Sequence, residues 1–211
     1  MRKLQAKCKQ CRREGIKLML KGDRCMLPKC AMIKRGYPPG QHGIKGRSKP
    51  TAYGEQLREK QKAKKTYGIL EKQFALYYKE AIRRKGDASE NLTQLLEMRL
   101  DNIIYRLGFA QSRNQAKQMV SHNLFLVNNK KANIISYQIK VGDIITLRDK
   151  SKKLKLFANL ADTLNKSKGQ VPNWLSIDID SLTAKILTTP KKGEIAETNF
   201  DIKAIIEFYS R

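Results

Sequence analysis

The four cysteines are the residues of this sequence most suited to chemistry, and all lie within the first 30 positions: Cys8, Cys11, Cys25 and Cys30. Two residues separate the first pair and four separate the second. Two close pairs that flank a short loop match tetrahedral Zn²⁺ binding, in which each pair holds one edge of the metal. Because four protein thiolates leave no open position for a substrate, the spacing predicts one structural zinc ion rather than a catalytic one.

Two other uses of the cysteines stay open at this point. Disulfides would need an oxidising compartment, and nothing in the sequence indicates one. Four thiolates could also hold an iron–sulfur cluster, although the spacings differ from the ferredoxin patterns. Few apolar residues separate the two pairs, so a bound metal would replace a core and supply folding energy. We expect nearby cations, Arg12 and Arg13 among them, to offset the thiolate charge and to leave this region basic.

The charge of the whole chain indicates a polyanionic partner. The 211 residues include 44 Lys and Arg against 19 Asp and Glu, a formal net charge of +25, and residues 1–72 hold 21 of the basic and only 5 of the acidic side chains. Such a charge belongs with nucleic acid or an anionic membrane face, and the alternative is an ordinary solvated basic surface. No apolar run approaches the length of a membrane span and none follows the N-terminus, so we expect a cytoplasmic chain without a membrane partner.

The basic residues of the first third fall on segments with little apolar material. Residues 36–50 are rich in Pro and Gly, which predicts an extended or turning segment. It is either a flexible linker or an arm that follows an RNA backbone, with cations that meet phosphates. Residues 55–65 are strong helix formers with almost no apolar face, so that helix needs a partner other than a core. The cations expected to contact phosphates in these two segments are Lys45, Arg47, Lys49, Arg58, Lys62 and Lys65.

Two amphipathic helices are expected next. Apolar residues in 74–82 and in 92–107 recur with the helical period, and a glycine follows each run. We expect the aromatic residues of the first run to form core rather than to stack on bases. On the second helix, Arg99, Asp101 and Arg106 fall on the polar side.

A third helix is predicted from a capping signal. Ser112 and Gln115 stand at the N-cap and third positions, where their side chains can satisfy the first free backbone amides. Arg113 and Lys117 then lie one turn apart on the face opposite to the apolar one. With His122, they give this pair of helices one apolar face and one cationic face.

The rest of the chain is expected to be mostly strands. Asn128-Asn129 suits a tight hairpin turn, with Lys130 and Lys131 just beyond it. Ser151 can cap a further helix that runs to Leu164. The segments whose apolar residues favour strands are 124–127, 135–141, 144–147, 175–180, 182–186 and 202–208.

These elements predict an α+β protein. Its main domain would be mostly helical, with an N-terminal zinc knuckle, and would carry an inserted small α/β RNA-binding module in which two helices pack on a small antiparallel sheet. Because the late strands are half-exposed on their own, we expect them to pack with the helices of residues 55–85. The expected divisions are 1–45 for the knuckle and basic arm, 46–94 with 160–211 for the body, and 95–159 for the module.

Several motifs resemble the S4 family of bacterial small-subunit ribosomal proteins from end to end. The module matches at Arg99-Leu100-Asp101, at 105–110, at Ser112-Arg113, at Gln115-Ala116 and at Val127-Asn128. Outside it the matching motifs are 38–43, 57–62, Tyr67-Gly68, 171–175 and 207–211. The cysteines are similar to those of the members that retain zinc. One departure is Asn123, where the family usually has glycine; Asn is the next best residue for a left-handed helix end.

The resemblance implies a primary binder of the 5′ domain of small-subunit rRNA, which gathers several RNA helices during assembly. It implies a neighbouring ribosomal protein, S5, and messenger RNA near the entry channel, with an influence on translational accuracy. Binding to the protein's own messenger RNA is a further option. The residues expected at RNA, by charge and by this matching, are Arg12, Arg13, Lys45, Arg47, Lys49, Arg58, Lys62, Lys65, Arg99, Arg106, Ser112, Arg113, Lys117, His122, Lys130 and Lys131.

Two other functions are alternatives to an RNA scaffold. An RNA-modifying enzyme of the pseudouridine synthase type can carry the same module, and Asp101 stands in a similar tripeptide. However, Asp101 lies within an amphipathic helix, which favours a structural ion pair, and no second domain remains to build a catalytic pocket. A zinc-dependent DNA regulator would need a dimer interface and a recognition helix, and neither is evident. We therefore expect no enzymatic activity.

Overall fold

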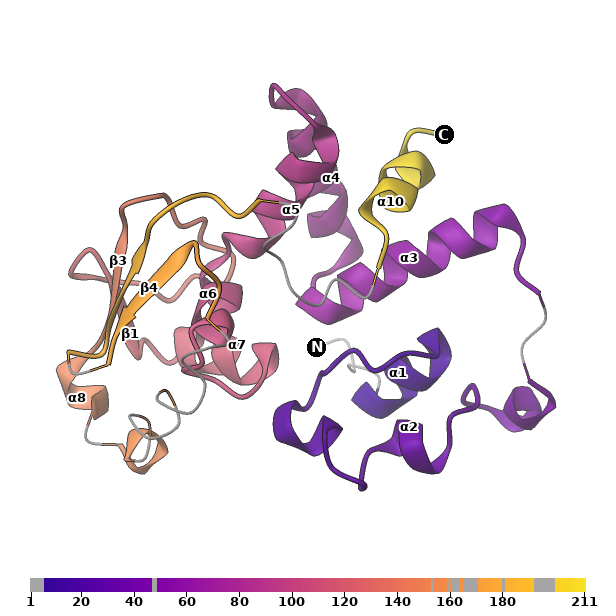
Figure 1. Cartoon of the computed structure of the whole chain (residues 1–211), viewed down its shortest axis with the longest axis horizontal. Coiled ribbons are helices and arrows are strands. Elements are labelled where there is room, and N and C mark those ends of the chain that lie inside the picture. The colour runs from indigo at the N-terminus through magenta and orange to yellow at the C-terminus, as the bar shows by residue number, and fades with distance from the viewer. Residues whose placement is uncertain are drawn as a thin grey trace. The chain divides into compact units, whose positions relative to one another are not determined.

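The computed structural model describes residues 6–46, 49–152, 154–158, 160, 164, 171–179, 181–191 and 200–211 (Figure 1). The chain divides into two compact units. The first consists of Met1–Ser89 with Glu197–Arg211, and the second of Glu90–Ala196.

The first unit is helical in its described part. It begins with α1 (Lys7–Glu14), a 3₁₀ turn (Gly22–Cys25), α2 (Ala31–Lys34) and a second 3₁₀ turn (Gln41–Lys45). The long helix α3 (Ala52–Tyr67) begins at Thr51, whose side chain accepts a hydrogen bond from the Gly54 amide. It ends at Gly68 in the left-handed conformation, and α4 (Glu71–Arg83) follows. The amphipathic helix expected at 74–82 is thereby confirmed.

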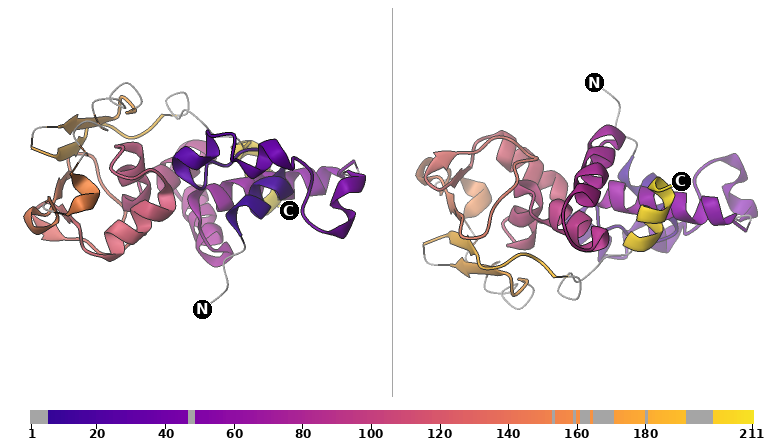
Figure 2. Two further views of the ribbon diagram at one scale, coloured as in Figure 1. Left: turned by 90° about the horizontal axis from the view of Figure 1, so that it is seen from below. Right: turned by 90° about the horizontal axis from the view of Figure 1, so that it is seen from above.

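The C-terminal segment is helix α10 (Ile202–Tyr209), and the strand predicted for 202–208 is wrong. Alternating apolar residues suggested a strand, but the fully buried residue is Ile205, which breaks that alternation. Asp201 caps the helix by accepting a hydrogen bond from the Lys203 amide at 2.8 Å. The helix then packs along α3 (Figure 2), with ring contacts from Phe208 and Tyr209 to aromatic residues of α3 and α4. A helical period and an N-cap therefore outweigh the two-residue alternation.

The second unit packs helices against an antiparallel sheet. Its helices are α5 (Ala88–Glu97, which begins in the first unit), α6 (Leu100–Arg106) and α7 (Arg113–Ser121), followed by the short α8 (Asp149–Lys152) and a 3₁₀ turn (Lys155–Phe157). The described strands are β1 (Phe125–Val127), β2 (Lys130–Lys131), β3 (Ile144–Leu147), β4 (Leu175–Asp178) and β5 (Thr183–Ile186). They form one sheet in the order β2-β1-β3-β5-β4, and all its pairs are antiparallel.

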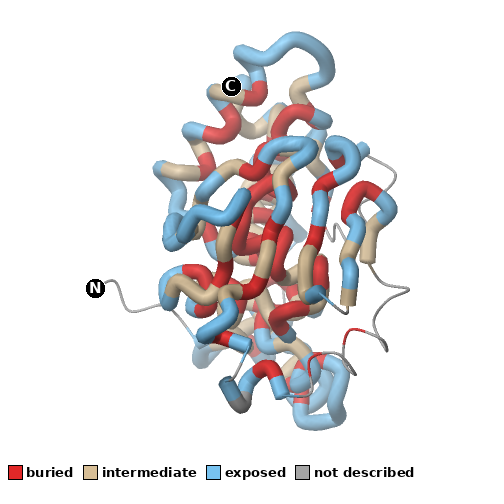
Figure 3. The backbone as a smooth tube through the Cα atoms, turned by 90° about the vertical axis from the view of Figure 1, so that its left-hand side faces the viewer, coloured by how far each residue is buried: buried red, intermediate tan, exposed pale blue. Residues whose placement is uncertain are grey.

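Apolar side chains from these helices and strands share one core. Phe125 and Ile145 are fully buried in it together with Ile104 of α6 and Val120 of α7. Figure 3 shows the buried positions of this unit gathered between its helices and its sheet. The expected arrangement of two helices on a small antiparallel sheet is confirmed for this unit.

The turns of the module follow the predicted backbone. Asn128 and Asn129 have φ of 49° and 64°, as a tight hairpin between β1 and β2 requires. Asn123 has φ of 57° immediately after α7, so it occupies the left-handed helix end predicted for it. Asparagine tolerates this conformation better than most residues that have a side chain, because its short polar side chain can form a local hydrogen bond.

Three details of the second unit differ from expectation. The single helix expected over 92–107 is interrupted at residues 98–99, between α5 and α6. No strand forms at 135–141, because this segment instead exchanges backbone hydrogen bonds with residues 98–100, Leu100 with Tyr137 and Ile139 with Met98. The helix expected from Ser151 to Leu164 is interrupted: Ser151 is an interior, buried residue of α8, Phe157 lies in the 3₁₀ turn that follows, and Leu160 and Leu164 are again helical. The other residues between 159 and 170 lie outside the described residues.

The late strands belong to the sheet of the second unit. Ala184 of β5 pairs with Ile145 of β3, and β4 pairs with β5. The expectation that 175–186 packs with the helices of 55–85 is therefore wrong. The physical reason is that Ala184 and Ile186 bury their side chains in the same core as the side chains of β1 and β3. If β5 packed elsewhere, that part of the core would be uncovered. Of the segments after residue 160, the first unit contains α10.

Candidate nucleic-acid interface

The start of α7 is built as the sequence predicts. The Ser112 side chain accepts a hydrogen bond from the Gln115 amide at 3.3 Å and caps the helix. The Gln115 side chain reaches back to the Gln111 amide at 2.9 Å, one residue earlier than in the expected reciprocal pair. The Ser112 hydroxyl thus fixes where α7 begins, and the RNA contact predicted for Ser112 stays a prediction.

Two cations of α7 lie against α6. The Arg113 Nε donates to Asn102 Oδ1 at 2.8 Å, and its guanidinium lies over the Tyr105 ring, 4.4 Å from the ring centroid. The Lys117 Nζ lies 3.6 Å from Asp101 Oδ2. Both residues are partly exposed, so this arrangement presents a cationic edge at the surface of the module. We name Arg113 and Lys117 the α7 edge.

Arg99 is an interior residue and Arg106 is partly buried, so the polar side of this helix faces protein more than solvent. Arg99 is 4 % exposed and donates from Nε and a terminal nitrogen to both oxygens of Asp101, at 3.0 and 3.1 Å. Arg106 forms the same two-pronged contact with Glu97, at 3.0 and 2.9 Å. For Arg99, helical spacing could not reveal this, because the segment that contains Gln138 pairs with it. Asp101 has the structural ion pair that its sequence position favoured.

The remaining residues of the module that were predicted at RNA lie on its surface. Lys130 and Lys131 form the whole of β2, an edge strand, and both are exposed. His122 is exposed at the end of α7. These residues are available to a polyanion in the way that the sequence predicted.

The cations of α3 have protein partners. Arg58 and Lys65 both form ion pairs with Glu14 of α1, whose side chain is fully buried, and Lys62 pairs with Glu59 on its own helix. The sequence predicts that this helix needs a partner other than a hydrophobic core. In the structure, α1 and α10 are in large part that partner. Phosphates could be met only by the exposed fraction of these side chains, which is 37 % for Arg58.

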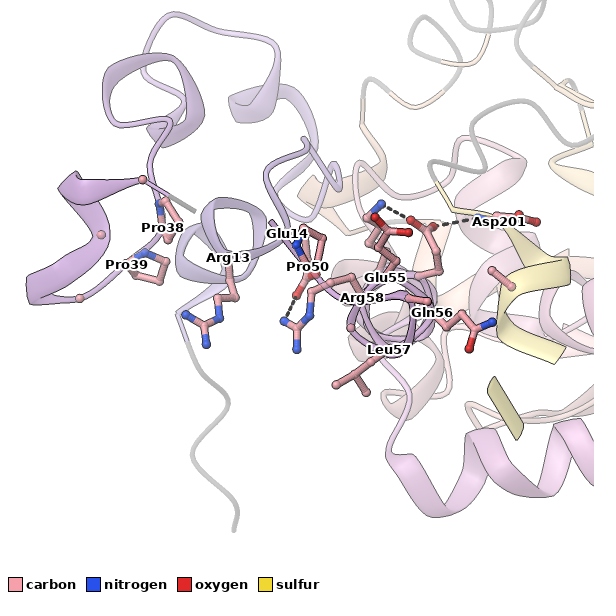
Figure 4. A pocket seen from close by; sticks show the side chains of 18 of the residues that line it. Arg13, Glu14, Pro38, Pro39, Pro50, Glu55, Gln56, Leu57, Arg58 and Asp201 are labelled. Carbon is pink, nitrogen blue, oxygen red and sulfur yellow. Dashed lines mark hydrogen bonds and ion pairs between the residues drawn. The ribbon is translucent and has the colours of Figure 1, made fainter. Parts of the chain in front are cut away.

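A large groove of the first unit runs beside α3 and the end of α1, at Arg13 and Glu14. It has a volume of about 1150 Å³ and is lined by residues of 38–43, by the first half of α3 and by α10. Figure 4 shows Arg13 and Arg58 at this groove, with the Arg58 guanidinium on the buried carboxylate of Glu14. Arg13 is exposed, whereas Arg12 donates to the Tyr37 carbonyl oxygen at 3.0 Å and lies over the Tyr37 ring.

The arm between α2 and α3 carries the other predicted cations of the first unit. Lys45 and Lys49 are exposed. Arg47, predicted beside them, lies outside the described residues. Residues 41–45 form a 3₁₀ turn rather than a wholly irregular segment.

The four cysteines line one small cavity of about 20 Å³, which is of the order of the ~10–15 Å³ that a single water-sized sphere needs. None is in a disulfide. The Lys21 amide donates to the Cys25 sulfur at 3.4 Å. Burial raises the pKa of the Cys11 thiol, against a backbone hydrogen bond from Leu18 that lowers it. Within the described residues no three His, Cys, Asp or Glu side chains stand close enough to form a metal-binding group.

Three residues of the interface escaped sequence reasoning: Asn102, Tyr105 and Glu14. Asn102 and Tyr105 lie on α6 and contact Arg113 eleven and eight positions later in the chain. Glu14 lies on α1 and contacts α3. One signal was visible for Glu14, which is an isolated acidic residue within a strongly basic segment. No local pattern marks the other two.

The fold and the cationic edge of the second unit define a class of protein, the S4-domain RNA-binding proteins. Residues 98–145 match the family model of the S4 domain, and residues 2–97 match that of the ribosomal protein S4/S9 N-terminal domain. The chain is 52 % identical over 204 residues to the small ribosomal subunit protein uS4 of Heliobacterium modesticaldum, which covers 97 % of this chain and 96 % of that protein. It is also 52 % identical over 209 residues to uS4A of Clostridium botulinum (98 % and 97 % covered) and 50 % identical over 204 residues to uS4 of Thermotoga petrophila (97 % and 96 %).

The chain belongs to the uS4 family of small ribosomal subunit proteins. This membership confirms the resemblance seen in its motifs, and it confirms that the chain is a structural ribosomal protein rather than an RNA-modifying enzyme. Among the helices that the structure describes, none is both long and apolar enough to cross a membrane.

Proposed function

We propose that this protein is a primary rRNA-binding constituent of the small ribosomal subunit and that it holds the 5′ domain junction of the rRNA through the α7 edge. The observation that carries the proposal is the α7 edge itself, two cations one helical turn apart at a partly exposed surface. The buried carboxylates of Glu97, at the end of α5, and of Asp101, on α6, hold Arg106 and Arg99 in ion pairs. Arg113 and Lys117 lie where a phosphate can contact both of them.

The affinity would come mainly from electrostatics. Cations that replace condensed counterions on RNA make the binding constant fall steeply with salt. Lys130 and Lys131 on β2 extend the positive surface beyond the α7 edge. Specificity would come from the shape of the junction, because the deep major groove of A-form RNA is closed to side chains.

Filter binding of small-subunit rRNA at several salt concentrations tests this function. Arg113→Ala with Lys117→Ala should weaken binding and reduce the slope of log K against log salt by roughly 1.4 on the single-strand scale or up to about 1.8 on the duplex scale. Lys140→Ala with Lys185→Ala is the matched control, because it removes two exposed lysines of the same unit. An unchanged slope in the α7 variant, or an equal change in the control, would contradict the assignment.

We propose further that the cysteine cavity holds one structural Zn²⁺. Four free thiols line a space of single-ion size, and the sulfurs of Cys25 and Cys11 accept backbone N–H groups. When bound, the metal would link α1 to the turns that carry Cys25 and Cys30. Elemental analysis should find about one zinc per chain. A metal-free protein with a folded segment 6–46 would overturn this proposal.

The exposed arm supports contacts beyond the rRNA junction. We infer that Lys45 and Lys49, with Arg47, face messenger RNA near the entry channel, and that S5 is a neighbouring protein in the subunit. Cross-linking from a photoreactive group at position 45 in assembled subunits tests the first inference, since it should label messenger RNA. Labelling of rRNA alone would contradict it. Whether the same surface takes up the protein's own message can be measured in the same way with that message as the probe.

A further inference from the structure

The α7 edge is connected to the interior of the second unit through a chain of polar contacts. The carboxylate of Glu97 is fully buried and is held by the two-pronged contact with Arg106. The Asn102 Nδ2 donates to Glu97 Oε2 at 2.7 Å and to the Glu97 carbonyl oxygen at 3.0 Å. With its amide nitrogen committed to Glu97, the Asn102 side chain must turn its oxygen toward Arg113.

That oxygen meets the Arg113 Nε at 2.8 Å. A hydrogen bond at Nε fixes one edge of the planar guanidinium, and the Tyr105 ring 4.4 Å away fixes the plane in which it lies. A free arginine side chain would lose rotamer entropy when it is ordered by a ligand. Here Asn102 and Tyr105 have already ordered it before any RNA arrives.

Asp101 performs the corresponding task for Lys117. Both Asp101 carboxylate oxygens accept hydrogen bonds from Arg99, and Oδ1 also accepts one from the backbone N–H of Asn102 at 3.0 Å. This fixed carboxylate lies 3.6 Å from the Lys117 Nζ. Consecutive residues of α6 therefore face consecutive turns of α7, Asn102 toward Arg113 and Asp101 toward Lys117.

We propose that Asn102 and Tyr105, with Asp101, are positioning residues that preorganise Arg113 and Lys117 for phosphate binding, and that the buried Arg106–Glu97 pair exists to orient Asn102. This inference rests on the proposed rRNA-binding function of the α7 edge. It assigns a role to Arg106 different from the RNA contact predicted for it, because Arg106 acts through Glu97 and Asn102. Preorganisation raises affinity by lowering the cost of ordering the side chain on binding.

A double-mutant cycle in filter binding of small-subunit rRNA tests the proposal with the full-length chain. Asn102→Ala should weaken rRNA binding roughly fivefold to tenfold, while Asn102→Ala added to Arg113→Ala should weaken it no further than Arg113→Ala alone. Thermal melting of each variant, with Asn91→Ala as a control for loss of a buried asparagine on α5, shows whether the fold is kept. Additive losses from Asn102 and Arg113 would overturn the positioning role.

The Tyr105 variants give a second test that does not depend on the stability of Asn102→Ala. Tyr105→Phe keeps the ring under the guanidinium and should bind rRNA as the parent does. Tyr105→Leu removes the ring and should bind several-fold more weakly, with the loss again absent when Arg113 is alanine. Equal binding by Phe and Leu variants would overturn the proposal and leave the function of the α7 edge intact, whereas full binding by Arg113→Ala would overturn both.

Discussion

The N-terminal segment 6–46 and the second unit are held together by different forces. In the N-terminal segment the buried apolar cluster is small, with Leu18, Leu20 and Cys11 at its centre, and Met26, Leu27 and Ile33 are exposed. The second unit buries aromatic and aliphatic side chains from α6, α7 and its sheet in one core. The comparison teaches that segment 6–46 has few buried apolar residues to hold it together, which is why we propose a metal there, whereas the second unit relies on an ordinary core.

Removal of the proposed zinc should separate the two regions most clearly. Binding free energies of structural zinc are of order 10 kcal/mol or more, so chelation, or Cys8→Ser, should unfold segment 6–46. The second unit should keep its native structure because its core contains no cysteine. Amide hydrogen exchange measured along the chain checks this, and a loss of protection throughout the second unit would show that the two regions are not independent.

A core substitution should have the opposite pattern. Phe125 is fully buried and packs edge-on against Phe109, with 5.5 Å between ring centroids. Phe125→Ala should lower the free energy of unfolding of the second unit by about 3–5 kcal/mol, measured by urea denaturation. The zinc content should stay at that of the parent. A coincident loss of zinc would indicate one cooperative fold.

The link between α1 and α3 should be sensitive to one buried carboxylate. Glu14→Gln keeps the size of the side chain but leaves Arg58 and Lys65 without its charge. Because Arg58 is partly solvated, we expect a loss of about 1–3 kcal/mol rather than the full cost of breaking a buried ion pair. Glu80→Gln, which removes an exposed carboxylate on α4, is the control and should change stability by less than about 0.5 kcal/mol.

The smallest effect is a dependence on acid pH at the junction of α3, α4 and α10. Burial alone would raise the pKa of Glu71, but hydrogen bonds from Lys60, Lys64 and Tyr209 outweigh it and lower that pKa to about 2. A carboxyl with a depressed folded pKa stabilises the protein above its ordinary value of 4.5, and this contribution is lost as the pH falls from there toward 2. Since Glu71 is 45 % exposed, we expect less than about 1 kcal/mol.

Denaturation of the parent and of Glu71→Gln at several pH values measures this contribution. The stability difference between them should shrink as the pH is lowered through this range. A constant difference would mean that the Glu71 contacts contribute nothing that depends on its charge. Burial and the hydrogen bond to Glu71 raise the pKa of Tyr209. The stability difference between the parent and Glu71→Gln should therefore be flat on the alkaline side up to the ordinary tyrosine range.

Local backbone chemistry could be predicted from sequence, and tertiary pairing could not. Asn123, Asn128 and Ser112 adopt the predicted conformations because each depends on its own side chain and its immediate neighbours. Ile205 and the strand pairing of β5 depend on which distant segment covers them. A short alternating run such as 202–208 is compatible with a strand and with a half-buried helix until that partner is known.

The same distinction separates the parts of the candidate site. Arg113 and Lys117 were found from helical spacing, since the face opposite to the core is fixed by the apolar residues of α7 itself. Arg99 is not at the surface because a distant segment pairs with residues 98–100, and Arg106 turns toward the buried carboxylate of Glu97 on α5. Charge identifies the residues that could bind RNA, but only the contacts separate those that face the solvent from those that hold them in place.

Chemical footprinting of small-subunit rRNA, with and without the purified protein, tests the central claim most directly. We predict protection of backbone positions clustered at one multi-helix junction of the 5′ domain, and loss of part of this protection with Arg113→Ala and Lys117→Ala. Uniform protection along the rRNA, or an unchanged pattern in that double variant, would contradict the claim that the α7 edge recognises a folded junction.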